Sequence, residues 1–125
     1  MASYERTHRP PAPFTRVTLL DSAIGARSDP VAAKLDTGAD ITVLPQALVT
    51  ELDLISGAIA WSRGYDSSYS RTPVYYVDLL VEGYHLLNVQ CIATERDDIL
   101  LGRNVLNQFI ITLDGKNQIV TMEDP

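Results

Sequence analysis

The segment Leu35-Asp36-Thr37-Gly38-Ala39-Asp40 extends an apolar run that starts at Val31, and a second apolar run, residues 41–44, follows it. Such runs are typical of β-strands. A later segment, Ile99-Leu100-Leu101-Gly102-Arg103-Asn104, also joins apolar residues to a glycine. Glycine permits tight turns, and an aspartate two residues before it can cap them. The pattern predicts that Asp36 lies in a tight loop at the end of a strand.

The composition is that of one globular domain with a modest core. The chain has 125 residues, of which 46% are hydrophobic and 21% charged. The net charge of −6 provides no basic surface, so we expect neither a nucleic-acid partner nor a membrane partner. The N-terminal residues lack the apolar core of a secretory signal, and no run approaches the ~18 apolar residues of a membrane span. We therefore expect a cytoplasmic location.

Cys91 is the only cysteine of the sequence, so no internal disulfide is expected. It lies in the apolar run 86–92, which predicts a buried structural thiol. His8 and His85 are the only histidines, too few to build a metal cluster with one cysteine. We expect no metal and no cofactor.

The order of short apolar runs and turn signals predicts an all-β barrel or sandwich. Residues 1–13 end in Pro10-Pro11-Ala12-Pro13 and are predicted to be a flexible N-terminal arm, so regular structure should begin at Phe14 and the domain should span 14–125. Strands are expected over 14–20, 31–36 and 41–44, and hairpins over 74–93 and 110–122. Short helices are expected over 45–52 and 103–109.

Asp36 has a carboxyl group that could act as an acid or a base. Cleavage of a peptide by water needs one group that takes a proton and another that gives one. Two carboxylates a few ångströms apart do both, because like charges at that distance cannot both ionise and one proton is shared. The structural alternative is that Asp-Thr-Gly is only a β-turn in which Asp36 caps the backbone.

The two quoted segments, in their order and separation, resemble those of the retropepsin-like aspartic proteases, the single-lobe enzymes of retroviral type, over residues 14–122. The resemblance implies a closed barrel or sandwich of short strands with one short C-terminal helix. It implies a homodimeric endopeptidase that hydrolyses peptide or protein substrates without a cofactor. Asp36 of each protomer would be the catalytic carboxylate, the Thr37 hydroxyl would interlock the two loops, and Gly38 would contact the substrate backbone.

The resemblance extends to residues around the loop. Asp40 and Arg103 fall where the family forms an ion pair within the chain, although a turn residue and a surface residue are the simpler interpretations. Ala39, Asp40 and Leu100 fall at substrate-binding positions, and Leu100 is alternatively a plain core residue.

Two regions depart from the retroviral pattern. The expected flap, residues 57–74, has no glycine-rich tip and contains Trp61, Gly64 and Tyr65 instead. Trp61 and Tyr65 either contact substrate or pack the stem of the hairpin. At the C-terminus the turn 114–117 returns the chain for another strand, so the layout of a dimer interface stays open.

Two other functions remain open. One is a dimeric peptide-binding module with the same fold that does not cleave, or restricts its own cleavage. The other is glycoside hydrolysis, which needs a second carboxylate opposite Asp36 in the same chain. Asp40 and Asp53 are its candidates.

Overall fold

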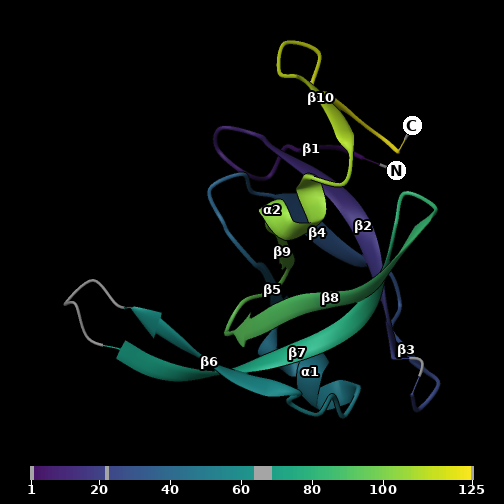
Figure 1. The fold of residues 1–125 in the computed structure, drawn as a ribbon. Coiled ribbons are helices and arrows are strands. Elements are labelled where there is room, and N and C mark those ends of the chain that lie inside the picture. Colours follow the sequence, from purple (N-terminus) through teal and green to yellow (C-terminus); the bar gives the residue numbers. More distant parts are fainter. Residues whose placement is uncertain (1, 22, 64–68, 125) are drawn as a thin grey trace.

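The computed structural model describes residues 2–21, 23–63 and 69–124, with backbone alone over 58–63 and 69–71. Short strands dominate it (Figure 1). The elements in chain order are β1 (Ser3–Glu5), β2 (Ala12–Asp21), β3 (Ala26–Arg27), β4 (Val31–Leu35), β5 (Thr42–Pro45), α1 (Gln46–Glu51), β6 (Ala58–Arg63), β7 (Tyr69–Val81), β8 (Tyr84–Thr94), β9 (Ile99–Leu101), α2 (Arg103–Leu106), β10 (Ile110–Asp114) and β11 (Ile119–Glu123).

Six strands of the described residues close into a barrel, in the order β2-β4-β9-β5-β8-β7, and β7 pairs back to β2. Side chains that point inward from these strands form the core, and Leu19, Leu44, Leu79, Ile99 and Leu101 are among the fully buried ones. Successive strand residues face opposite sides, which is why Leu100 between two buried neighbours is only partly buried. The predicted closed all-β barrel is confirmed.

The position of the Asp36 loop follows from one parallel pairing. β4 runs parallel to β9, with Leu35 opposite Leu101. Asp36 therefore comes directly after the last barrel residue of β4, and the loop lies beside the start of α2 (Figure 1). Both strands are anchored by buried side chains on the core face, so the loop leaves a rigid base.

Both predicted hairpins are present. β7 and β8 pair across Glu82 and Gly83, which have φ of 49° and 82°. Two positive φ values in a two-residue loop give the turn whose twist matches that of paired strands. β10 and β11 pair across the turn 115–118. The two predicted helices are present but short, and α2 ends at Leu106, before the expected Phe109.

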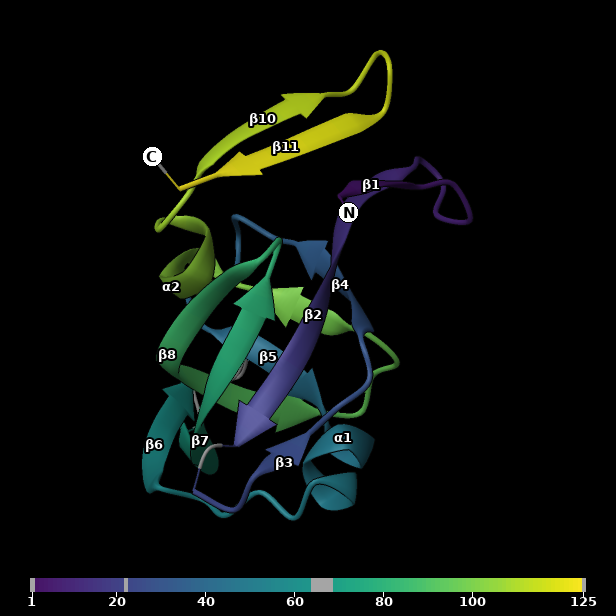
Figure 2. The same ribbon diagram turned by 90° about the vertical axis from the view of Figure 1, so that its right-hand side faces the viewer.

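Regular structure begins earlier than the expected Phe14. Ser3–Glu5 forms β1, which pairs with β2 and with β11, and Ala2 is buried (Figure 2). The short polar sequence of this segment gives little sign of a strand. The strand forms because Ser3–Glu5 pairs along its whole length with the start of β2, and β11, from the other end of the chain, adds a pair at Ser3.

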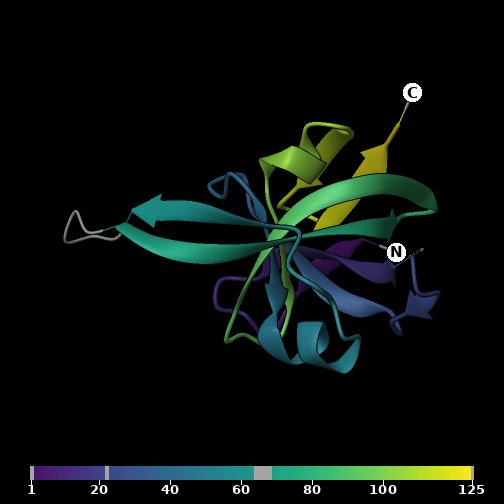
Figure 3. The same ribbon diagram turned by 60° about the horizontal axis from the view of Figure 1, so that its bottom comes forward.

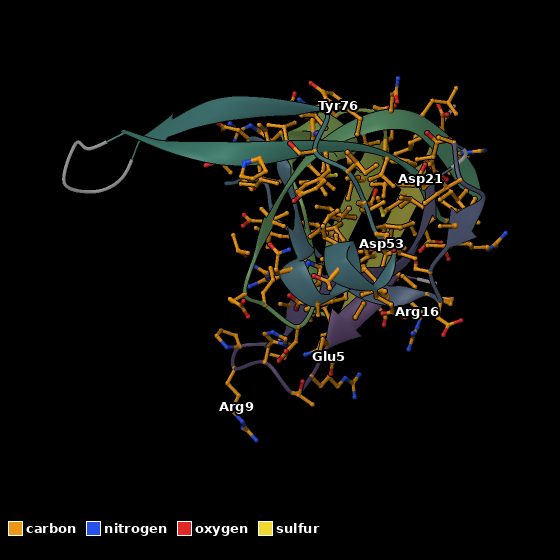
Figure 4. All side chains as sticks on the ribbon, turned by 90° about the horizontal axis from the view of Figure 1, so that it is seen from below. Glu5, Arg9, Arg16, Asp21, Asp53 and Tyr76 are labelled. Carbon is orange, nitrogen blue, oxygen red and sulfur yellow. The ribbon has the colours of Figure 1, made fainter. Side chains whose placement is uncertain are left out.

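The expected flap forms a hairpin of β6 and β7 that projects from the barrel (Figure 3). Tyr76 lies at its base, where the hairpin joins the barrel (Figure 4). There the Tyr76 ring lies so close to Gly57 that a Cβ at Gly57 would stand 3.0 Å from a ring carbon. Among the described residues, no helix combines the length and apolar character needed to cross a bilayer.

Candidate active site

The Asp36 loop is fixed by backbone hydrogen bonds on both sides of the carboxylate. Asp36 N donates to Leu101 O over 3.0 Å, and Ala39 N donates to Asp36 O over 3.2 Å. The side chain is partly buried, and its Oδ1 accepts a hydrogen bond of 2.9 Å from Gly38 N. Asp-Thr-Gly therefore forms a turn in which Asp36 caps the backbone, and the same hydrogen bond fixes the rotamer of the carboxylate. The second oxygen, Oδ2, makes no hydrogen bond with the residues that the structure describes.

Arg103 contacts the loop at three points. Its backbone N donates to Ala39 O over 2.8 Å, and its Nη1 donates to Thr37 O over 2.6 Å. Its Nη2 pairs with Asp40 Oδ1. The side chains are 44% exposed for Arg103 and 82% exposed for Asp40, so the pair lies at the surface of this chain. Exposed pairs contribute little by themselves.

Gly102 allows the loop and α2 to meet. A Cβ at this residue would lie 2.5 Å from the carbonyl carbon of Ile41 and 2.9 Å from Thr42 N. Those are backbone atoms, which cannot rotate away. Glycine is therefore required here by close approach, although its φ of −85° suits any residue.

Thr42 and Asn104 are polar residues of the site that the sequence interpretation gave no role. Thr42 is fully buried, and its Oγ1 donates to Asn104 Oδ1 over 2.9 Å. The same Oγ1 accepts a hydrogen bond of 3.2 Å from Gly102 N. In the sequence, each of the two is a polar residue within or close to an apolar run. Such a residue is expected to be buried, and a buried polar group needs a hydrogen-bond partner.

A cavity of about 280 Å³ opens beside Asp36. Asp36 and Thr37 lie on its wall with four apolar residues, Leu35, Leu106, Ile111 and Leu113. Leu113 is 50% exposed although it is large and apolar. A larger cavity, about 620 Å³, lies against α1, and its wall includes Asp53 but no residue of the Asp36 loop.

The remaining predicted site residues are placed as follows. Gly38 is exposed and Ala39 partly buried in the loop, and Leu100 is partly buried on β9. Trp61 lies in β6 opposite Arg71, with only its backbone described. Gly64 and Tyr65 lie outside the described residues.

Cys91 is fully buried, and burial raises the pKa of its thiol to about 12. A thiol of that pKa is protonated at neutral pH and is a poor nucleophile or metal ligand. Within residues 2–21, 23–63 and 69–124, no cluster of three or more His, Cys, Asp or Glu side chains could hold a metal ion.

A family model and solved structures of other proteins are similar to this chain. The family model described as "gag-polyprotein putative aspartyl protease" matches residues 23–108. No curated protein matches the chain in sequence.

Solved structures show the same fold. The crystal structure of a retropepsin-like aspartic protease from Rickettsia conorii has a TM-score of 0.67 and 15% identity, covering 98% of this chain and 88% of that one. The solution structure of the simian foamy virus (mac) protease has a TM-score of 0.58 and 21% identity, covering 75% of this chain and 91% of that one. Since the family model spans more than half of the sequence, the chain belongs to the gag-polyprotein aspartyl protease family and has the retropepsin-like fold.

Proposed function

We propose that the chain is an endopeptidase that works as a homodimer, in which the Asp36 carboxylates of two protomers activate one water molecule. The observation that carries the proposal is the Asp36 side chain itself. It is partly buried at the end of a barrel strand, and Gly38 N holds one of its oxygens. A carboxylate fixed in this way is preorganised for acid–base chemistry.

A second copy is required by the chemistry. Peptide hydrolysis by a pair of carboxyls needs one of them protonated and the other ionised. Asp40, the nearest acid in the loop sequence, is paired with Arg103 and largely exposed. The second carboxyl in this proposal is the Asp36 of the partner. In a two-fold dimer the same surface of each copy meets at the axis, so the surroundings of Asp36 would be buried there.

The surface near Asp36 suits such burial. Leu113 on the wall of the cavity is half exposed, and on the same hairpin Ile110 and Ile119 are 54% and 51% exposed. Large apolar side chains in water favour association. In the proposed enzyme the backbone of Gly38, the side chains of Ala39, Asp40 and Leu100, and the β6–β7 hairpin contact the substrate peptide.

The test is Asp36→Asn, compared with Asp53→Asn as a matched control. Asp53 is exposed, and its φ of 53° is one that Asn tolerates well. We expect Asp36→Asn to lower kcat on a peptide library by roughly a thousandfold or more, because both carboxyls of each site disappear together. Asp53→Asn should retain the wild-type rate.

The same enzyme preparation tests the dimer. The rate per chain should rise with protein concentration until the dimer saturates, and kcat should follow a bell-shaped pH curve. Turnover that survives Asp36→Asn would refute the proposed chemistry. A folded wild-type chain that binds peptides at all concentrations and cleaves none would identify the binding module instead.

A further inference from the structure

Asn104 uses both ends of its side-chain amide to connect three elements. Its Oδ1 accepts two hydrogen bonds from Thr42, 3.1 Å from the backbone N and 2.9 Å from Oγ1. Its Nδ2 donates to Gln90 O over 2.9 Å. Asn104 lies in α2, Thr42 begins β5 and Gln90 lies in β8, so one side chain joins the helix, the strand after the Asp36 loop and the barrel wall.

The chemistry of these contacts requires an amide. Two donors of Thr42 face Oδ1, and a carbonyl acceptor faces Nδ2, so the reversed amide would oppose donor to donor and acceptor to acceptor. A carboxylate would satisfy Thr42 but would face the Gln90 carbonyl with a second acceptor. An apolar side chain would leave the fully buried Thr42 hydroxyl with one partner fewer.

The Asp36 loop is connected to this network at both ends. At its start, Asp36 N donates to Leu101 O over 3.0 Å. At its end, Thr42 Oγ1 accepts from Gly102 N over 3.2 Å and donates to Asn104. Residues 101–104 thus hold the entry and the exit of the loop, and a shift of Thr42 would change the direction in which the loop presents Asp36.

We propose that Asn104 is a positioning residue for the Asp36 carboxylate, which it orients through Thr42. The expected effect on kcat rests on the proposed function. The expected effect on the orientation of the Asp36 loop rests on the hydrogen bonds alone. A misplacement of a catalytic group by about 1 Å lowers rates by about a hundredfold. The loss therefore falls on kcat, because Asn104 itself contacts no substrate.

The test is Asn104→Asp, with Asn107→Asp as the matched control, since Asn107 is exposed just after the same helix. At pH 7 the introduced carboxylate faces the Gln90 carbonyl, and we expect kcat to fall at least tenfold while KM changes less than threefold. At acid pH the protonated carboxyl donates to Gln90 O and still accepts from Thr42. The ratio of wild-type to variant kcat should therefore shrink as pH falls, whereas for Asn107→Asp it should stay near one.

A second measurement does not need activity. In ¹⁵N-edited NMR spectra of the chain, the Gly38 amide reports on its hydrogen bond to Asp36 Oδ1. In Asn104→Asp this signal should move with the titration of the introduced carboxyl, and in Asn107→Asp it should follow the wild type. If the Gly38 signal and the kcat ratio both match the control, the positioning role is refuted.

A milder pair of variants covers the case in which Asn104→Asp does not fold. Thr42→Ser keeps the hydroxyl and Thr42→Val removes it at nearly the same volume. We expect Thr42→Val to lower kcat at least tenfold more than Thr42→Ser, and equal losses would refute the network. If the wild type is inactive but the Gly38 amide signal of Asn104→Asp shifts with pH as expected, the proposed function is overturned. The role of Asn104 in the loop is then still supported.

Discussion

Gly102→Ala tests the close approach of α2 to the Asp36 loop. The added Cβ would lie 2.5 Å from the Ile41 carbonyl carbon, whereas ordinary contacts begin at 3.4 Å, so the two backbones must separate by about 0.9 Å. That displacement would break the bond from Arg103 N to Ala39 O, now 2.8 Å, and the bond from Gly102 N to Thr42 Oγ1, now 3.2 Å. The perturbation therefore combines overpacking with lost hydrogen bonds.

The expected loss in the free energy of unfolding is about 3 kcal/mol. Overpacking of a filled site costs about 1–3 kcal/mol, and each lost hydrogen bond about 1 kcal/mol, with partial relaxation of the loop reducing the sum. For a domain of this size the loss corresponds to a Tm lower by about 10 °C. Thermal unfolding followed by circular dichroism, and urea unfolding at 25 °C, measure it directly.

Gly115→Ala is the control for Gly102→Ala. A Cβ at Gly115 would meet only the Tyr4 hydroxyl, at an ordinary 3.7 Å, and Gly115 has no positive φ that would add strain. We expect Gly115→Ala to change Tm by less than about 2 °C, in line with most surface substitutions. If the two variants melt within about 2 °C of each other, the contact between Gly102 and Ile41 does not limit the packing of the loop.

Two further predictions follow from exposure and burial. Arg103→Ala should lower the free energy of unfolding by about 1–2 kcal/mol relative to Arg6→Ala in urea titrations, because the pair with Asp40 is exposed and the bond from Nη1 to Thr37 O is also lost; a loss above about 3 kcal/mol would contradict this. Burial raises the pKa of Cys91 to about 12, whereas an exposed thiol titrates near about 8.5. The folded chain then keeps a proton that the unfolded chain releases, so the stability that the buried thiol contributes is lost as pH rises from about 8.5 towards 12. In urea titrations, the free energy of unfolding should fall more between pH 8 and pH 10 for wild type than for Cys91→Ser. Equal decreases in the two proteins would refute the effect.

The sequence by itself determined the features that depend on neighbours along the chain. Strands show a period of two because their side chains alternate between core and solvent, as Ile99, Leu100 and Leu101 do in β9. A tight turn depends on a few residues with positive φ, and Glu82 and Gly83 are those residues between β7 and β8. The barrel class and both hairpins were predictable for that reason, as was the family.

The tertiary structure alone decided the contacts between distant segments. β1 pairs with the start of β2, and the contact of Ser3 with Ile119 of β11 joins the two ends of the chain, which no local pattern encodes. The pair of Asp40 and Arg103 lies at the surface of this chain, although residue types alone cannot distinguish a buried pair from an exposed one. Gly102, Thr42 and Asn104 meet because the parallel pairing of β4 with β9 brings α2 against the Asp36 loop. Distances of a few ångströms between residues some sixty positions apart are set by the packing of the whole barrel, and no local pattern of residues records them.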